Sequence, residues 1–163
     1  MKWLITKTFK FEAGHRVWKQ NLTYGRGSQF TEGSIQNKCI NLHGHSYKLE
    51  VTLGSDVLSD QEMVMDFYHV KSALKDLIEE IDHSFIIDRN DPMHDELKTL
   101  AEKYGALKVF SVDFCPTAEA LAKFFYDFLE DKLKKANLLG EVAVVKVTLW
   151  ETPTSKAEYS NYI

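Results

Sequence analysis

Apolar and polar residues alternate in two segments near the start of the chain. One face of residues 3–15 carries mainly apolar side chains and a histidine: Phe9, Phe11, Ala13 and His15. Residues 42–54 repeat the pattern, with one face made of His43, His45, Tyr47, Leu49, Val51 and Leu53. A period of two is typical of a half-buried β-strand. The pattern therefore predicts two strands whose three histidines can face the same core.

Two later segments have the periodicity of amphipathic helices. Asp66 is suited to cap a helix that ends near residues 82–83, in which apolar residues recur at helical spacing: Phe67, Val70, Leu74, Leu77, Ile78 and Ile81. A second helix follows residues 116–117 and stops at Gly140, and one stripe of it carries Leu121, Phe124, Phe125, Phe128 and Leu133.

The remaining segments are less regular. Residues 16–38 predict a long loop, residues 91–104 a short inserted helix and residues 107–112 an extended piece. Strands are predicted at 155–162 and at 141–151, where one face holds Ala143, Val145, Val147, Leu149 and Glu151. Strands thus gather at both ends of the chain. This order favours an α+β fold, with a four-stranded antiparallel sheet and two main helices on one face.

Length and composition restrict the class of protein. The 163 residues are expected to form a single domain, 1–163, and 44% hydrophobic with 27% charged residues is typical of a globular protein. The net charge of −4, without a basic stripe, argues against a nucleic-acid partner. Lys7 interrupts any signal-peptide core, and no apolar run is long enough to span a membrane. A cytoplasmic protein with two reduced cysteines is expected.

The clearest candidate chemistry is a metal site. His43 and His45 lie on one face of a predicted strand, and His15 on the neighbouring strand could complete a three-nitrogen site with a vacant position, as in catalytic zinc sites. The alternative is that the His-x-His spacing is incidental.

Four other positions could take part in catalysis. Cys39 could border the metal and act as a thiolate base, or it could be a small buried hydrophobe. Asp82-His83 could be an acid–base pair or an exposed helix end. Glu151 could accept two N–H groups of a ligand, or the strand could have ended before it. Thr117 fits a helix N-cap.

Six short motifs occur in the order of a known family. They are Phe11-Glu12-Ala13-Gly14-His15, Cys39-Ile40-Asn41-Leu42-His43-Gly44-His45-Ser46-Tyr47, Met63-Val64-Met65-Asp66-Phe67, Ile81-Asp82-His83, Pro116-Thr117-Ala118-Glu119 and Trp150-Glu151-Thr152. In these motifs the chain resembles the 6-pyruvoyltetrahydropterin and 6-carboxytetrahydropterin synthases. Three residues separate Cys39 from the His-Gly-His motif, as in the carboxy-forming enzymes of queuosine biosynthesis.

The resemblance implies a lyase of the tunnelling fold. Its substrate would be 7,8-dihydroneopterin triphosphate, cleaved to 6-carboxy-5,6,7,8-tetrahydropterin, acetaldehyde and triphosphate. The implied site comprises zinc on His15, His43 and His45, Cys39 as base, Asp82 with His83 as a charge relay, and Glu151 with Thr117 on the pterin. It also implies a homo-oligomer (trimer, tetramer or hexamer) with sites between subunits. The alternatives are 6-pyruvoyl formation, a non-catalytic zinc or pterin-binding protein, and a plain zinc hydrolase.

Overall fold

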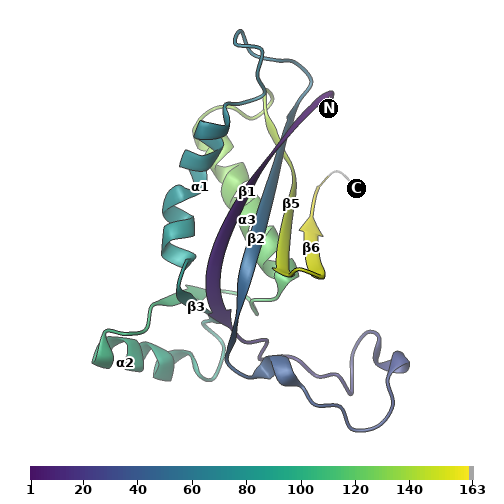
Figure 1. The fold of residues 1–163 in the computed structure, drawn as a ribbon, viewed down its shortest axis with the longest axis vertical. Helices are drawn as coiled ribbons and strands as arrows, with labels where there is room; N and C mark the ends of the chain where they lie inside the picture. The colour runs from purple at the N-terminus through teal and green to yellow at the C-terminus, as the bar shows by residue number, and fades with distance from the viewer. Residues whose placement is uncertain (162–163) are drawn as a thin grey trace.

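The computed structural model describes residues 1–161 and has an α+β fold. Its single sheet has the order β4-β3-β1-β2-β5-β6, with bounds β1 Trp3–His15, β2 His43–Ser55, β3 Ser84–Asp88, β4 Val109–Val112, β5 Ala143–Thr152 and β6 Ser155–Tyr159. Three α-helices accompany it: α1 Phe67–Ile81, α2 His94–Tyr104 and α3 Ala118–Lys135. Figure 1 shows α1 and α3 on one side of the curved sheet.

The predicted four-stranded antiparallel sheet is wrong in two respects. The four expected strands form and pair antiparallel, but β3 and β4 extend the sheet to six strands. β3 joins β1 in parallel at Ala13 and Gly14, and β4 joins β3 in parallel, so the sheet is mixed. β3 has only five residues and follows α1 after two, which is too short for periodicity to separate it from the helix. The prediction of an extended piece at 107–112 is confirmed by β4.

The helix predictions are confirmed except at one end. The Asp66 carboxylate accepts a hydrogen bond from the Tyr68 N–H at 2.8 Å, and the Thr117 hydroxyl accepts one from the Ala120 N–H at 3.2 Å, so each caps its helix. α2 lies within the predicted 91–104. The last helix ends at Lys135 rather than at Gly140, because Asn137 takes a left-handed conformation with φ 58°.

The core lies between the helices and one face of the sheet. Phe11, Tyr47, Leu49 and Leu53 reach it from β1 and β2, as the alternation predicts. The prediction for β5 is wrong in its first half. Thr52 pairs with Lys146 but Leu53 pairs with Val144, so Val145 is the extra residue of a bulge in β5. The bulge changes the register, so that Val144 is buried and Ala143 and Val145 are not.

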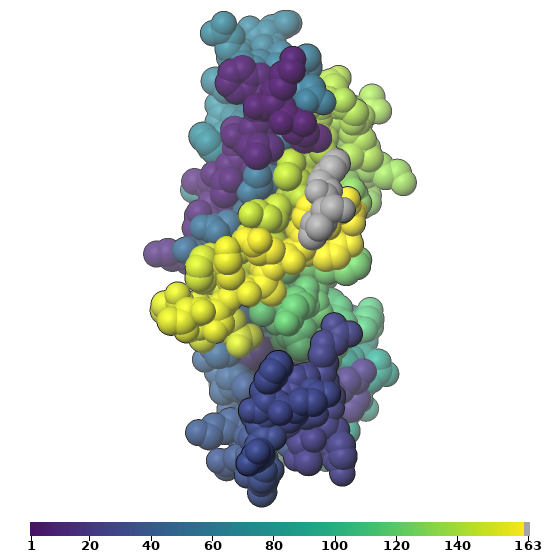
Figure 2. Space-filling model, turned by 90° about the vertical axis from the view of Figure 1, so that its right-hand side faces the viewer, coloured from purple at the N-terminus to yellow at the C-terminus, as the bar shows by residue number. Residues whose placement is uncertain are grey.

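The loop predicted at 16–38 is largely irregular, with short 3₁₀ turns at Ser28–Phe30 and Lys38–Ile40. Figures 1 and 2 show this blue segment at one end of the molecule.

The predicted last strand reaches residue 162, which lies outside the described residues, whereas β6 ends at Tyr159. Within residues 1–161, no helix is long and apolar enough to cross a membrane.

Candidate metal and catalytic site

Three histidines meet where β1 ends and β2 begins. The antiparallel register sets His15 directly opposite His43, and His45 lies two residues further on the same face. One ring nitrogen of each histidine lies within 4.8 Å of the others. His15 is fully buried, whereas His43 and His45 are half-buried. The predicted convergence of these side chains is therefore present.

Backbone carbonyls orient two of the imidazoles. The Nδ1–H of His15 donates to the Pro116 carbonyl at 2.8 Å, and the Nδ1–H of His43 donates to the Asn41 carbonyl at 2.7 Å. Because a carbonyl can only accept, both neutral rings carry their lone pair on Nε2. These two Nε2 atoms lie 3.0 Å apart. Two facing lone pairs repel unless a cation or proton lies between them.

A shared proton does not suit the electrostatics of this site. Burial lowers the pKa of His15 to about 4, and burial also lowers the pKa of His45, against the raising effect of Glu151. The Nε2 of His45 is buried and has no hydrogen-bond partner among residues 1–161. Neutral imidazoles with unshared Nε2 lone pairs are suitable ligands for a divalent metal. The residues present therefore fit a metal ion.

Glu151 lies beside the histidines. Its carboxylate oxygens are 3.6 Å from His45 Nε2 and 3.9 Å from His15 Nε2, and its side chain is 25% exposed. These separations exceed hydrogen-bond length and the rings are neutral, so they are close contacts rather than ion pairs. Glu151 is part of β5 and lines a pocket of about 570 Å³ with Gly44, Lys48 and Trp150. The alternative that the strand ends before Glu151 is therefore excluded.

Tyr47 was assigned no role from the sequence, although it underlies the histidines. Its ring stacks on Phe11 at 4.9 Å between centroids and meets the edges of the His15 and His45 rings. Burial raises the pKa of its hydroxyl, and that hydroxyl has no hydrogen-bond partner in the described part of the chain. The Tyr47 ring thus packs against the His15 and His45 imidazoles and restricts their orientation. Its place in the alternating face of β2 is the signal that could have indicated this contact.

Cys39 lies near the histidines along the chain but outside the group of converging nitrogens. It is the middle residue of the 3₁₀ turn Lys38–Ile40 and is half-buried. Its carbonyl accepts from the Val17 N–H at 2.8 Å, and its N–H donates to the Gln20 side chain at 2.9 Å. Its peptide is therefore held by the segment that leaves β1 directly after His15.

Asp82 and His83 contact each other at the end of α1. Asp82 Oδ2 lies 3.0 Å from His83 Nδ1, and Asp82 Oδ1 accepts from the Glu12 N–H at 2.8 Å. That backbone hydrogen bond is the main reason the pKa of Asp82 is lowered. The His83 side chain is 77% exposed, and it shares a depression of about 380 Å³ with His45 and Ser46. The pair is thus formed, and His83 remains open to an incoming group.

Thr117 is structural, as its sequence context predicts, because its hydroxyl caps α3. It nevertheless adjoins the site, since the carbonyl of the preceding Pro116 orients His15. The carbonyls of Pro116 and Asn41 are functional groups that the sequence did not indicate, because every residue has a carbonyl and only the fold selects two of them.

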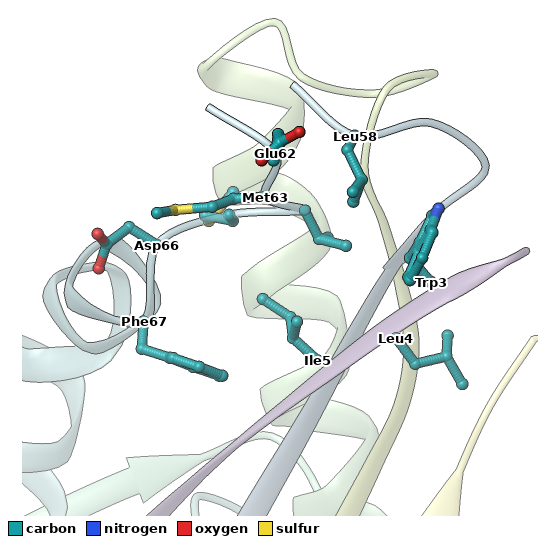
Figure 3. Close-up of a pocket in the computed structure, with 10 residues that line it drawn as sticks. Trp3, Leu4, Ile5, Leu58, Glu62, Met63, Asp66 and Phe67 are labelled. Atoms are coloured by element: carbon teal, nitrogen blue, oxygen red, sulfur yellow. The ribbon is translucent and has the colours of Figure 1, made fainter. Parts of the chain in front are cut away.

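A separate apolar pocket of about 340 Å³ lies at the opposite end of β1 from His15. Figure 3 shows its lining side chains, among them Trp3, Ile5, Met63 and Phe67. None of the candidate metal or catalytic residues lines this pocket. Trp3, Met63 and Phe67 are each 41–50% exposed, so this end presents apolar surface to its surroundings.

Comparison with known proteins agrees with this geometry. A family model described as 6-pyruvoyl tetrahydropterin synthase matches residues 4–162. A protein of Aquifex aeolicus named 6-carboxy-5,6,7,8-tetrahydropterin synthase is 78% identical over 98% of both chains. One of the same name from Haemophilus influenzae is 37% identical over 95% of this chain and 96% of its own.

Solved structures share the same architecture. An uncharacterized protein from Wolinella succinogenes, 28% identical, superimposes with a TM-score of 0.81 over 98% of both chains. The 6-pyruvoyl tetrahydropterin synthase of Caenorhabditis elegans superimposes with a TM-score of 0.63 over 98% of this chain and 95% of its own. At 20% identity, that second similarity shows the fold alone.

Proposed function

The chain belongs to the 6-pyruvoyl tetrahydropterin synthase family, and we propose that it acts as a 6-carboxy-5,6,7,8-tetrahydropterin synthase. It would convert 7,8-dihydroneopterin triphosphate to the 6-carboxy product, acetaldehyde and triphosphate, as a lyase of queuosine biosynthesis. The observation that carries this proposal is the 78% identity, over 98% of both chains, to a relative with that name. The three residues between Cys39 and His43 agree with it.

We assign the metal site to His15, His43 and His45 and the metal to Zn²⁺. Three neutral nitrogen ligands match the usual donor set of a catalytic zinc ion, which keeps a further position for substrate. When bound, zinc supplies Lewis-acid polarisation of the hydroxyl oxygens of the substrate side chain. The protein supports this site with the carbonyls of Pro116 and Asn41, which hold His15 and His43 with Nε2 facing inward.

The other site residues have separate roles in the proposed reaction. The Glu151 carboxylate accepts hydrogen bonds from two parallel N–H groups of the pterin ring. This contact orients the substrate side chain toward the histidines. Cys39 removes the proton from the carbon that carries the polarised hydroxyl. His83, held in one orientation by Asp82, returns a proton during carbon–carbon cleavage. Thr117 lies beside the pterin as the first-turn cap of α3.

We propose that the protein acts as a homo-oligomer with sites between subunits. β6 pairs only with β5, and β1 meets β3 only at Ala13 and Gly14, so residues 3–11 leave one edge of β1 unpaired among residues 1–161. Unpaired strand edges favour pairing with another chain. Exposed Trp3, Met63 and Phe67 adjoin that edge. The His83 side chain is exposed enough to reach a substrate bound to a neighbouring subunit.

Product analysis tests the reaction directly. The zinc-loaded protein is incubated with 7,8-dihydroneopterin triphosphate, and the products are identified by mass. We expect 6-carboxytetrahydropterin with acetaldehyde in equal amount, and no product after the metal is removed by chelation. A 6-pyruvoyl product would assign the chain to the other branch of its family. The absence of any product would leave a zinc or pterin-binding protein.

The Glu151→Gln substitution is expected to weaken pterin binding without removing the metal. The amide replaces one acceptor oxygen with a donor, so one ring N–H loses its partner. Hydrogen bonds to charged groups are worth about 1.5–3 kcal/mol, so affinity should fall by about ten- to a hundredfold. Titration of the zinc-loaded variant with 6-carboxytetrahydropterin measures this change.

Glu80→Gln is the matched control, because Glu80 lies exposed on α1 and lines none of the pockets described above. Its pterin affinity and zinc content should equal those of the wild type. Unchanged affinity in Glu151→Gln would show that Glu151 does not bind the ring.

A further inference from the structure

The segment that holds Cys39 is itself held by the turn between β3 and α2. Arg16 donates to the Asp91 carboxylate twice, from Nε at 2.6 Å and from Nη2 at 2.7 Å. The side chains of Arg16 and Asp91 are only 13% and 1% exposed. A bidentate, buried pair of this kind fixes both position and angle.

Arg16 continues this connection toward the thiol. Its third contact runs from Nη1 to the carbonyl of Ile40, at 3.2 Å. The next residue, Val17, donates its N–H to the Cys39 carbonyl. The consecutive carbonyls of Cys39 and Ile40 are thus held by the consecutive residues Val17 and Arg16.

Asp91 is well suited to serve as the fixed end of this chain of contacts. Its Oδ1 also accepts from the Met93 N–H at 2.9 Å, and its N–H donates to the Asp88 carbonyl at 3.0 Å. Burial alone would raise the pKa of Asp91, but the hydrogen bonds from Arg16 and Met93 lower it overall. A second bond, from Trp18 Nε1 to Asp88 Oδ2 at 3.0 Å, joins the same two segments.

We propose that Asp91 is a positioning residue for catalysis, which holds Cys39 in place through Arg16. This inference rests on the proposed role of Cys39 as the base. It gives a function to the inserted β3–α2 region, since that region supplies the carboxylate. It also implies that Arg16 does not bind the triphosphate of the substrate, because its guanidinium group is already bound to Asp91 and to the Ile40 carbonyl.

Two variants test the proposal in a Cys115→Ser background, where Cys39 is the only thiol. Asp91→Asn removes the negative charge that holds the Arg16 guanidinium. Arg16→Lys keeps a positive charge but loses the bidentate contact with Asp91 and the hydrogen bond to the Ile40 carbonyl. If Asp91→Asn does not fold, Arg16→Lys decides the test. We measure kcat, KM, zinc content and the rate at which iodoacetamide alkylates Cys39.

In both variants Cys39 is no longer held in place, whereas the residues that bind the substrate are unchanged. We therefore expect kcat to fall about 10- to 100-fold with KM changed less than about threefold, since misplacement by about 1 Å can cost a hundredfold. Alkylation of Cys39 should become several-fold faster, and zinc content should stay the same. A purely structural effect would not separate kcat from KM in this way.

Asp113→Asn is the matched control. Asp113, directly after β4, contacts Arg89 of the β3–α2 turn at 2.7 Å, but both side chains are at least half-exposed. It should change neither kcat nor alkylation. Unchanged alkylation in Asp91→Asn and Arg16→Lys, or faster alkylation with unchanged kcat, would overturn the proposal. If the wild type formed no product, the proposed function would fail, and alkylation would still decide whether Asp91 holds Cys39.

Discussion

Replacing Cys39 by alanine is expected to reduce turnover of dihydroneopterin triphosphate by at least about 10²- to 10⁴-fold, the usual contribution of a positioned acid or base. The thiol is the group we assign to proton removal. The backbone of Cys39 is held at its carbonyl by the Val17 N–H and at its N–H by the Gln20 side chain. Alanine keeps these backbone contacts, so zinc content and the unfolding temperature should stay close to the wild type. Single-turnover product formation measures the effect.

Cys115→Ala is the natural control, because Cys115 is also half-buried and is the only other cysteine in the sequence. It should retain turnover. Equal activity of Cys39→Ala and the wild type would remove the thiol from the mechanism, whereas loss of activity in both variants would indicate a general effect on the fold.

The His43→Ala substitution is expected to abolish stoichiometric zinc binding and, with it, turnover. It removes one of three converging nitrogens, and loss of a ligand should cost more than the roughly 10- to 100-fold that loss of an outer partner costs. It also removes one of the two lone pairs that face each other at 3.0 Å. The metal-free variant should therefore be at least as stable as the metal-free wild type.

Zinc content by elemental analysis and thermal unfolding with and without zinc measure these effects. The unfolding temperature of the wild type should rise on zinc addition, since a ligand that binds only the folded state stabilises it. That of His43→Ala should not. His69→Ala, at an exposed position on α1, should behave as the wild type. Full zinc content in His43→Ala would refute the ligand assignment.

Much of this fold is determined locally and could be predicted from the sequence. The alternation in residues 3–15 and 42–54 predicts β1 and β2, and it correctly places three histidines on one face because successive side chains of a strand alternate by geometry. Asp66 and Thr117 mark their helix starts because a cap satisfies N–H groups only one turn away. These features depend on neighbours within a few residues.

Other features required contacts between distant segments, and the sequence did not indicate them. The parallel pairing of β3 with β1 and the bulge at Val145 depend on strands that meet only in the folded chain. The same holds for the site. Periodicity could bring three imidazoles together, but the carbonyl of Pro116, 101 residues from His15, decides which nitrogen faces inward. Asp91 likewise meets Arg16 across 75 residues, because a buried charge must find its partner in the tertiary structure, whatever the distance along the chain.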